Sequence, residues 1–159
     1  MSTEGLDAVL EVRAVSWDDP DAERLRAAQR AEIAERYGTP DSEPGVAPSA
    51  ADITHFVVAY VGDEPAGCGG LRRIDDRHGE IKRMFVDPAH RGTGVSRAVL
   101  TALDTTAAGF GWDRLVLETG DQQPDAVRFY EREGFTRIPN FGHYVGHDAS
   151  LCYERKVRS

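Results

Sequence analysis

The sequence lacks several features that would mark particular classes of protein. It has only two cysteines, Cys68 and Cys152, both in apolar surroundings and with no CxxC pair, so we expect buried free thiols and no disulfide framework. Its longest apolar run, FVVAYV at 56–61, is far too short to span a membrane. The N-terminal segment MSTEGLDAVL lacks the charged and apolar regions of a secretory signal, so we expect a cytoplasmic protein without membrane partners.

An excess of positive charge is also missing. The chain carries 19 Lys and Arg against 27 Asp and Glu, which gives a net charge of −8 and a pI of about 5.1. Because no basic stripe is available to neutralise phosphates, we expect no nucleic-acid partner. The acidic balance agrees with a cationic small partner and, more simply, with an acidic surface that favours solubility.

What is present fits one folded domain. A chain of 159 residues with 40% apolar side chains is long enough for a real core, so residues 1–159 are interpreted as a single domain. Apolar residues recur with the period of a helix or a strand in successive segments, which gives the order β-α-β-β-β-α-β-α-β-β of a mixed α/β sandwich. The expected strands are 10–15, 54–61, 66–74, 80–86, 114–119, 135–138 and 151–157, the helices run from Pro20 to Gly38, from Val95 to Phe110 and from Pro124 to Gly134, and 39–52 is a long loop.

The stretch VDPAHRGTGVSRAVL, at 86–100, joins a strand to a helix through a loop with two glycines. A helix N-terminus presents unpaired N–H groups and a partial positive charge, and it therefore binds anions such as phosphate. The glycines let the backbone approach a ligand closely, and His90, Arg91 and Arg97 add positive charge. The pattern favours a pyrophosphate cradle, and the alternative is a plain turn with solvated charges.

Two other phosphate-binding motifs do not fit this loop. A P-loop would need GxxxxGK followed by Ser or Thr, and no such string occurs. A dinucleotide fingerprint GxGxxG would begin at Gly92, but Arg97 stands at its third glycine. The strand before the loop also belongs to a meander and not to a βαβ unit, so both motifs are excluded.

The string RGTGVS at 91–96 resembles the R/Q-x-x-G-x-G/A signature of the GCN5-related N-acetyltransferase (GNAT) family, with Ser96 where glycine or alanine is usual. The family has this order of elements over its whole length, so the resemblance covers about residues 10 to 157. It implies a GNAT-like mixed, mostly antiparallel sheet flanked by helices, and acetyl-CoA as co-substrate. The residues that it implies for the pyrophosphate are Arg91, Gly92, Thr93, Gly94, Val95, Ser96 and Arg97.

A second segment supports the resemblance. QPDAVRFYEREGF, at 123–135, is similar to the family's N-x-x-A-x-x-x-Y-x-x-x-G-F segment, with Gln123 in place of asparagine. Glutamine is a poorer helix cap, so a coenzyme hydrogen bond at this position is less well supported. The resemblance places Tyr130 near the thioester sulfur, where it can protonate the departing thiolate. Alternatively, Tyr130 is a core residue packed by Phe129.

Acetyl transfer to an amine needs a neutral nucleophile, so a base assists at neutral pH. The resemblance places the family's catalytic glutamate at Glu80, on the strand before the cradle. Glu80 can instead pair with Lys82, two residues on, and Glu118 in RLVLET is the second candidate for the base. By strand alternation Arg83 faces away from Glu80 and is interpreted as structural.

The attack forms a tetrahedral oxyanion that needs fixed N–H donors. The resemblance supplies them from the backbone of Met84, Phe85 and Val86, along which the pantetheine arm lies like an added strand. We expect direct transfer without an acetyl-enzyme, since nothing near Cys68 in the sequence activates it. No metal is expected, because Gly142 and Gly146 disfavour the helix that would align His143 with His147.

The acceptor is expected to bind in the variable loops 38–53 and 139–149, where His143 and Tyr144 either line its pocket or decorate the surface. The acidic balance favours the primary amine of a small molecule, such as a cationic amine or a polyamine. Two alternatives stay open, an acetyltransferase of protein or peptide amines and a non-catalytic acyl-CoA sensor. Dimers are frequent in the family, so a homodimer is a possible assembly.

Overall fold

A computed structural model describes residues 9–40, 42–45 and 47–158 of the chain. The expectation of no secretory signal rests largely on residues 1–8, which lie outside the described residues. The described elements follow the order predicted from the sequence, with short 3-10 helices added after β4 and β6. They are β1 (Leu10–Val15), α2 (Pro20–Tyr37), β2 (His55–Val61), β3 (Glu64–Arg73), β4 (His78–Val86), η1 (Pro88–His90), α3 (Val95–Gly109), β5 (Arg114–Gly120), α4 (Pro124–Arg132), β6 (Thr136–Ile138), η2 (Gly142–Tyr144) and β7 (Ser150–Lys156).

The strands form one seven-stranded sheet in the order β1-β2-β3-β4-β5-β7-β6. Every neighbouring pair is antiparallel except β4 and β5, which are parallel. The predicted mixed, mostly antiparallel sheet flanked by helices is therefore confirmed. β4 is the central strand, and the loop that follows it leads directly into α3.

The parallel pairing of β4 and β5 corrects one argument from the sequence. Two parallel neighbours need a crossover connection, and α3 provides it, so β4 both ends the antiparallel meander and begins a β–α–β unit. The meander was therefore no reason to exclude a dinucleotide motif. The turn before β4 determines only its pairing with β3 and leaves its pairing with β5 undetermined. Arg97 still stands where that motif has its third glycine, so its exclusion now rests on that residue alone.

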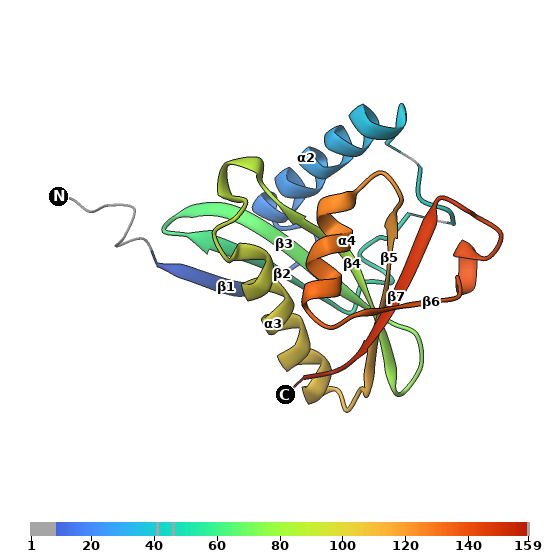
Figure 1. Cartoon of the computed structure of the whole chain (residues 1–159). Coiled ribbons are helices and arrows are strands. Elements are labelled where there is room, and N and C mark those ends of the chain that lie inside the picture. The colour runs from blue at the N-terminus through green and yellow to red at the C-terminus, as the bar shows by residue number, and fades with distance from the viewer. Residues whose placement is uncertain (1–8, 41, 46, 159) are drawn as a thin grey trace.

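Helices cover both faces of the sheet (Figure 1). α3 and α4 pack on one face over a large core cluster that includes Leu103, Leu117 and Tyr130. α2 packs on the other face, where Leu25 belongs to a smaller cluster with Phe56. Both α2 and α3 contact β4, so the central strand lies between helices from opposite faces.

The ends of the helices follow the capping residues in the sequence. The Asp19 carboxylate accepts hydrogen bonds from the N–H groups of Asp21 and Ala22, at 3.0 and 3.2 Å, and so begins α2. Gly38 ends it in the left-handed conformation, with φ of 79°. At α4, by contrast, the Gln123 side chain makes no capping hydrogen bond, as expected for a poor cap.

A β-bulge interrupts β4 close to its middle. Gly70 lies opposite Lys82 and Cys68 lies opposite Phe85, so two residues of β4 face a single residue of β3. Arg83 is one of the two bulged residues and has φ of 58°, the only positive φ of a non-glycine residue in the described ranges. A side chain in this conformation is strained, and such strain gathers at functional sites.

The bulge overturns the predicted orientation of Arg83. Its Nη1 lies 3.8 Å from Glu43 Oε1, and the same Glu43 pairs with Lys82, which in turn lies beside Glu80. Arg83 and Glu80 are therefore on the same side of the sheet. The alternation rule failed because the extra residue shifts the register by one position.

Candidate active site

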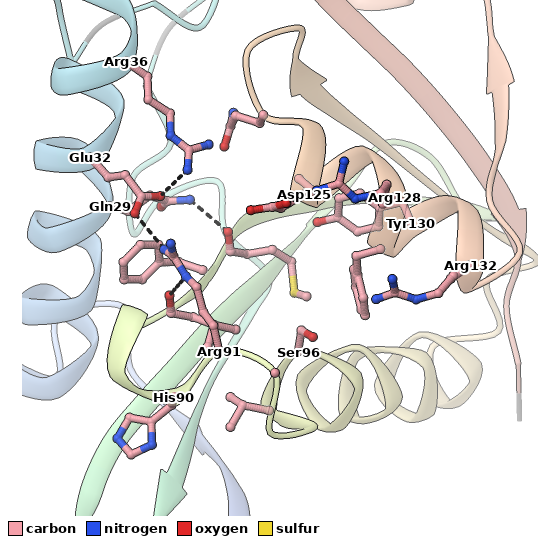
Figure 2. A pocket seen from close by; sticks show the side chains of 18 residues that line it. Gln29, Glu32, Arg36, His90, Arg91, Ser96, Asp125, Arg128, Tyr130 and Arg132 are labelled. Carbon is pink, nitrogen blue, oxygen red and sulfur yellow. Dashed lines mark hydrogen bonds and ion pairs between the residues drawn. The ribbon is translucent and has the colours of Figure 1, made fainter.

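The larger of two neighbouring cavities lies between α2, the start of α3 and α4, and has a volume of about 380 Å³ (Figure 2). Figure 2 shows side chains of α2 on one wall and of α4 on the other, with Arg91 and Ser96 between them. Most of the residues expected to bind the coenzyme line this cavity. They are Met84, Phe85, Val86, Arg91, Gly92, Val95, Ser96 and Gln123.

Positive charge is concentrated around this cavity although the whole chain is acidic. Four arginines line it, together with His90, whereas its acidic lining residues are Glu32 and Asp125. The arginines are Arg36, Arg91, Arg128 and Arg132. A cavity of this kind attracts a polyanion such as a nucleotide or a pyrophosphate.

Arg91 is held in place by two groups from different elements. Its Nε donates to the Val86 carbonyl at 3.0 Å, and its Nη2 donates to Glu32 Oε2 at 2.7 Å. Arg36 lies 3.9 Å from the other oxygen of Glu32. Arg91 is therefore already oriented toward the cavity, and an anion that enters competes with Glu32 for it.

The loop before α3 leaves the helix start open. Gly92 and Gly94 have φ of 76° and 88°, which favours glycine, and a Cβ at either would meet nothing within 4 Å. Among the described residues no side chain caps α3, so its first N–H groups are left for a ligand. The Thr93 hydroxyl donates to the His90 carbonyl and so fixes the shape of the loop.

Three residues of the predicted cradle do not line the cavity. Thr93 and Gly94 lie in the loop itself, and Arg97 points to α4, where its Nη2 lies 2.9 Å from Glu133 Oε2. Residues 91–94 form a turn with positive φ at Gly92 and Gly94, so consecutive residues face different sides. Arg97 thus links α3 to the end of α4. The positive charge near the loop comes from Arg91 and from the arginines of α4.

A second cavity of about 210 Å³ adjoins the first. It lies between the last part of β4, the end of β5 and the loop after α2, with Glu43, Lys82, Arg83, Glu118 and Ser150 among its lining residues. Five residues line both cavities, so the two spaces meet. They are Gln29, Met84, Gln123, Ala126 and Tyr130.

Tyr130 lies where the cavities meet, and it is also part of the core. Its side chain is 6% exposed and packs edge to face against Phe129 and Phe135, with ring centroids 5.3 and 5.5 Å away. Burial raises the pKa of its hydroxyl, which keeps the proton at neutral pH. The two interpretations of Tyr130 from the sequence therefore do not exclude one another.

Gln29 was missed by the sequence analysis. Its Nε2 donates to the Met84 carbonyl at 3.0 Å, and its Oε1 is buried without a partner among the described residues. A signal was available, because Gln29 lies one helical turn from both Leu25 and Ile33 on the apolar stripe of α2. A polar residue on such a stripe needs an explanation, and contact with both cavities supplies one.

Glu80 lies in a closed network and lines neither cavity. It is 2% exposed, its Oε1 accepts from Arg72 Nη2 at 2.7 Å, and its Oε2 lies 2.6 Å from the Tyr144 hydroxyl. Tyr144 also accepts from Lys82 at 2.9 Å and lies 3.1 Å from Glu43 Oε2. The network thus connects β4 to the two loops expected to bind the acceptor.

Glu118 has different surroundings. It lines the second cavity, and burial raises its pKa to about 7, with the charges of Glu43 and Glu80 adding to the effect while a hydrogen bond from Ser150 opposes it. A carboxyl group of this kind changes its protonation near neutral pH. That is the property that a general base for an amine requires.

The remaining candidates lie outside the cavities. Tyr144 belongs to the network beneath the second cavity, and His143 is exposed and packs against Gly45, where a Cβ would overlap its ring. The described residues hold no group of three or more His, Cys, Asp or Glu suited to a metal. Cys68 and Cys152 are buried free thiols, and burial raises the pKa of Cys68 to about 12.

Comparison with known proteins gives relatives for most of the chain. It is 40% identical over 103 residues to the uncharacterized N-acetyltransferase YsnE of Bacillus subtilis, which covers 64% of this chain and 68% of YsnE. A Klebsiella pneumoniae structure assigned to the acyl-CoA N-acyltransferases superposes with a TM-score of 0.81 and 25% identity, covering 96% of this chain and all of that one. No helix among the described residues has the length and apolarity needed to cross a bilayer.

A GNAT family acetyltransferase from Elizabethkingia anophelis, solved with acetyl-CoA bound, shares the fold with a TM-score of 0.68 at 15% identity, covering 92% of this chain and 97% of that one. The family model described as Acetyltransferase (GNAT) family matches residues 11–135, which include the cradle loop, β4, β5 and α4. The chain therefore belongs to the GNAT family and is an acetyl-CoA-dependent N-acetyltransferase.

Proposed function

We propose that the chain transfers an acetyl group from acetyl-CoA to the primary amine of a small molecule, with the coenzyme in the first cavity and the acceptor in the second. The observation that carries this proposal is the junction of the two cavities. One cavity is lined by arginines at an uncapped helix start, the other contains Glu118, and Tyr130 lies where they meet.

The residues of the first cavity fit a pyrophosphate and a pantetheine arm. Arg91 and the N–H groups at the start of α3 would hold the phosphates. The parallel ladder between β4 and β5 runs only as far as Ile81 and Leu117, whereas β4 continues to Val86. The backbone of Met84 to Val86 is thus placed to offer hydrogen bonds to the arm and to the thioester carbonyl.

For the base, the geometry favours Glu118 over Glu80, the residue preferred from the sequence. Both oxygens of Glu80 are engaged, by Arg72 and by Tyr144, and its side chain reaches neither cavity. Glu118 lines the cavity proposed for the acceptor, and burial raises its pKa to about 7. We assign to Glu118 the removal of the proton from the amine and to Glu80 the positioning of β4.

Tyr130 is assigned the role of acid. Its hydroxyl stays protonated at neutral pH and lies at the junction of the cavities, so it is placed to give a proton to the departing thiolate. Acetyl-CoA supplies the activated acetyl group when bound. We propose direct transfer to the amine, because Cys68 is fully buried and its raised pKa keeps it protonated.

Calorimetric titration with acetyl-CoA, beside dephospho-CoA and ATP, tests the coenzyme site. We expect binding of acetyl-CoA and a loss of about ten- to a hundredfold in affinity for Arg91→Ala, since that substitution removes charge-assisted hydrogen bonds to phosphate. Arg24→Ala is the matched control, because Arg24 is exposed on α2 and pairs only with Asp21 among the described residues. Equal affinities of the two variants would count against the cradle.

A screen of amines for release of the CoA thiol then tests the reaction. Turnover of small amines, and none of peptide amines, would support a small-molecule acceptor. Acetyl-CoA binding without turnover of any amine would favour the non-catalytic sensor. We further propose that the protein is cytoplasmic, has no nucleic-acid partner and forms a homodimer. Sedimentation of the purified protein tests the homodimer.

A further inference from the structure

Arg83 has a backbone conformation that is unfavourable for a residue with a side chain. A β-bulge can place glycine at a positive φ without strain, yet this chain has an arginine there, with φ of 58°. The side chain faces the second cavity and is 15% exposed. A strained backbone that aims a cationic side chain into a cavity indicates a role for that side chain in the cavity.

The guanidinium of Arg83 has unused hydrogen-bonding capacity. Its ion pair with Glu43 is long, with 3.8 Å between Nη1 and Oε1. The other oxygen of Glu43 is already engaged by Lys82 and lies near the Tyr144 hydroxyl. Within the described ranges no hydrogen bond from the Arg83 side chain is found, although a guanidinium offers five N–H donors.

The charges of the second cavity also constrain its ligand. Two cationic residues, Lys82 and Arg83, and two acidic residues, Glu43 and Glu118, line it. Lys82 and Glu43 form an ion pair with each other. This leaves Arg83 and Glu118 as the charged groups available to an acceptor. A cationic amine or polyamine, as expected from the net charge of the chain, would meet an arginine that it cannot pair with.

We propose that the acceptor carries a carboxylate beside its primary amine, and that Arg83 binds this carboxylate while Glu118 faces the amine. The inference rests on the proposed function and names its substrate class, an amino carboxylate. The planar fork of arginine matches a carboxylate with two parallel hydrogen bonds, which orients the acceptor in the cavity.

The transfer needs only acetyl-CoA, the acceptor and side chains of the two cavities. A C–N bond forms between the amine and the acetyl carbon while the C–S bond breaks. Glu118 takes a proton from the amine, Tyr130 gives a proton to the thiolate, and proton exchange with solvent then returns both side chains to their starting forms. The products are an N-acetyl amino carboxylate and the CoA thiol.

The first test compares amino carboxylates with the amines that lack the carboxylate, such as histidine with histamine and phenylalanine with phenethylamine. Thiol release is followed at saturating acetyl-CoA. We expect kcat/KM to be at least about tenfold higher for the amino carboxylate of a pair. Turnover of the plain amines at equal or higher efficiency would overturn the inference and leave the proposed function standing.

Three substitutions at Arg83 separate its charge from its backbone role. Arg83→Gln and Arg83→Gly should both raise KM for amino carboxylates by about ten- to a hundredfold, and Arg83→Lys should restore part of the loss. Gly relieves the strain, so a purely structural role predicts a normal KM for that variant. Arg13→Gln, in an exposed pair with Glu11 on β1, is the control.

Calorimetry with N-acetylphenylalanine and its amide, on the CoA-loaded protein, gives a readout that needs no turnover. Tighter binding of the acid than of the amide, lost in Arg83→Gln, supports the carboxylate site. Equal binding of the two overturns it. Failure of the chain to bind acetyl-CoA or CoA would instead contradict the proposed function. The titrations with acetyl-CoA detect such a failure before any acceptor is added.

Discussion

Two glutamates on neighbouring strands have opposite surroundings. Glu80 meets Arg72 and the Tyr144 hydroxyl, so its charge is matched inside the protein. Glu118 is half-buried near other acidic groups and has Ser150 as its hydrogen-bond donor. Burial and the neighbouring carboxylates make Glu118 hold its proton more strongly, and the Ser150 hydrogen bond and Lys82 only partly offset this effect. The strand sequences do not reveal this difference, because the partners come from other segments.

Glu118→Gln should remove the part of the pH–rate profile that rises near pH 7, and leave the later rise that follows deprotonation of the acceptor amine. In the wild type the base becomes active as it loses its proton, so kcat/KM is expected to rise with pH through about 7. The variant should lose about a hundredfold or more of its rate at pH 8, where Glu118 is ionised, with little change in acetyl-CoA affinity. Initial rates between pH 5.5 and 9 measure this.

Glu80→Gln is the matched comparison for that profile. It leaves Arg72 without its buried partner, so it should lower the free energy of unfolding while the limb near pH 7 persists. A limb that disappears in Glu80→Gln and survives in Glu118→Gln would reverse the two assignments. A partial loss of folded protein lowers the rates at every pH by the same factor. It therefore does not change the pH at which the rate rises.

At the scale of the elements, local signals in the sequence predicted most of the fold. Asp19 and Gly38 bound α2 as expected, and Gly134 with Phe135 ends α4, where the Phe135 N–H donates to the Tyr130 carbonyl. These signals involve residues close together in the chain. The bulge at Arg83 and the parallel pairing of β4 depend on partners far away in sequence, so periodicity alone gave the wrong face for Arg83.

The uncapped start of α4 gives a prediction about stability. Gln123→Asn should raise the free energy of unfolding by about 0.5–1 kcal/mol, because the shorter side chain can accept a hydrogen bond from the first turn. Chemical denaturation of the two proteins measures the change. Gln122→Asn, one residue outside the cap, controls for composition, and a stabilisation equal in both variants would rule out capping as the cause.

Across the whole molecule, the C-terminal strand is tied to both helices of one face. Arg155 on β7 forms a buried ion pair with Asp104 on α3, and its Nη1 donates to the Glu133 carbonyl, just past α4, at 3.0 Å. The N–H of Arg158 donates to Asp104 Oδ1 at 3.1 Å. Arg155 and Arg158 therefore hold α3 and α4 against the sheet, although neither of them lines either cavity.

Asp104→Asn should cost about 3–5 kcal/mol of the free energy of unfolding, because it leaves the Arg155 charge buried without its partner. Denaturant unfolding measures this cost. The partly exposed pair of Arg114 and Glu154, at 3.4 Å, is the control, and Arg114→Gln should change the same quantity by less than about 1 kcal/mol. Similar costs for both variants would mean that burial of the Asp104 pair has little effect.

The candidate site was predictable where one segment forms it. The loop at 91–96 could be read as an anion site because its glycines, Arg91 and the helix start are contiguous. Gln29 contacts Met84, and Tyr144 contacts Glu43, only in the folded chain, so no spacing in the sequence connects these partners. Long-range assembly, more than residue type, set the limit of what could be predicted.

The pair between Arg91 and Glu32 makes coenzyme binding, as proposed above, an exchange of counter-ions. A phosphate that reaches Arg91 releases the carboxylate of α2, and Gln29, one turn earlier on the same helix, connects α2 to β4 beside the acceptor space. The same helix therefore carries both the carboxylate that the coenzyme would displace and a side chain that lines the two cavities.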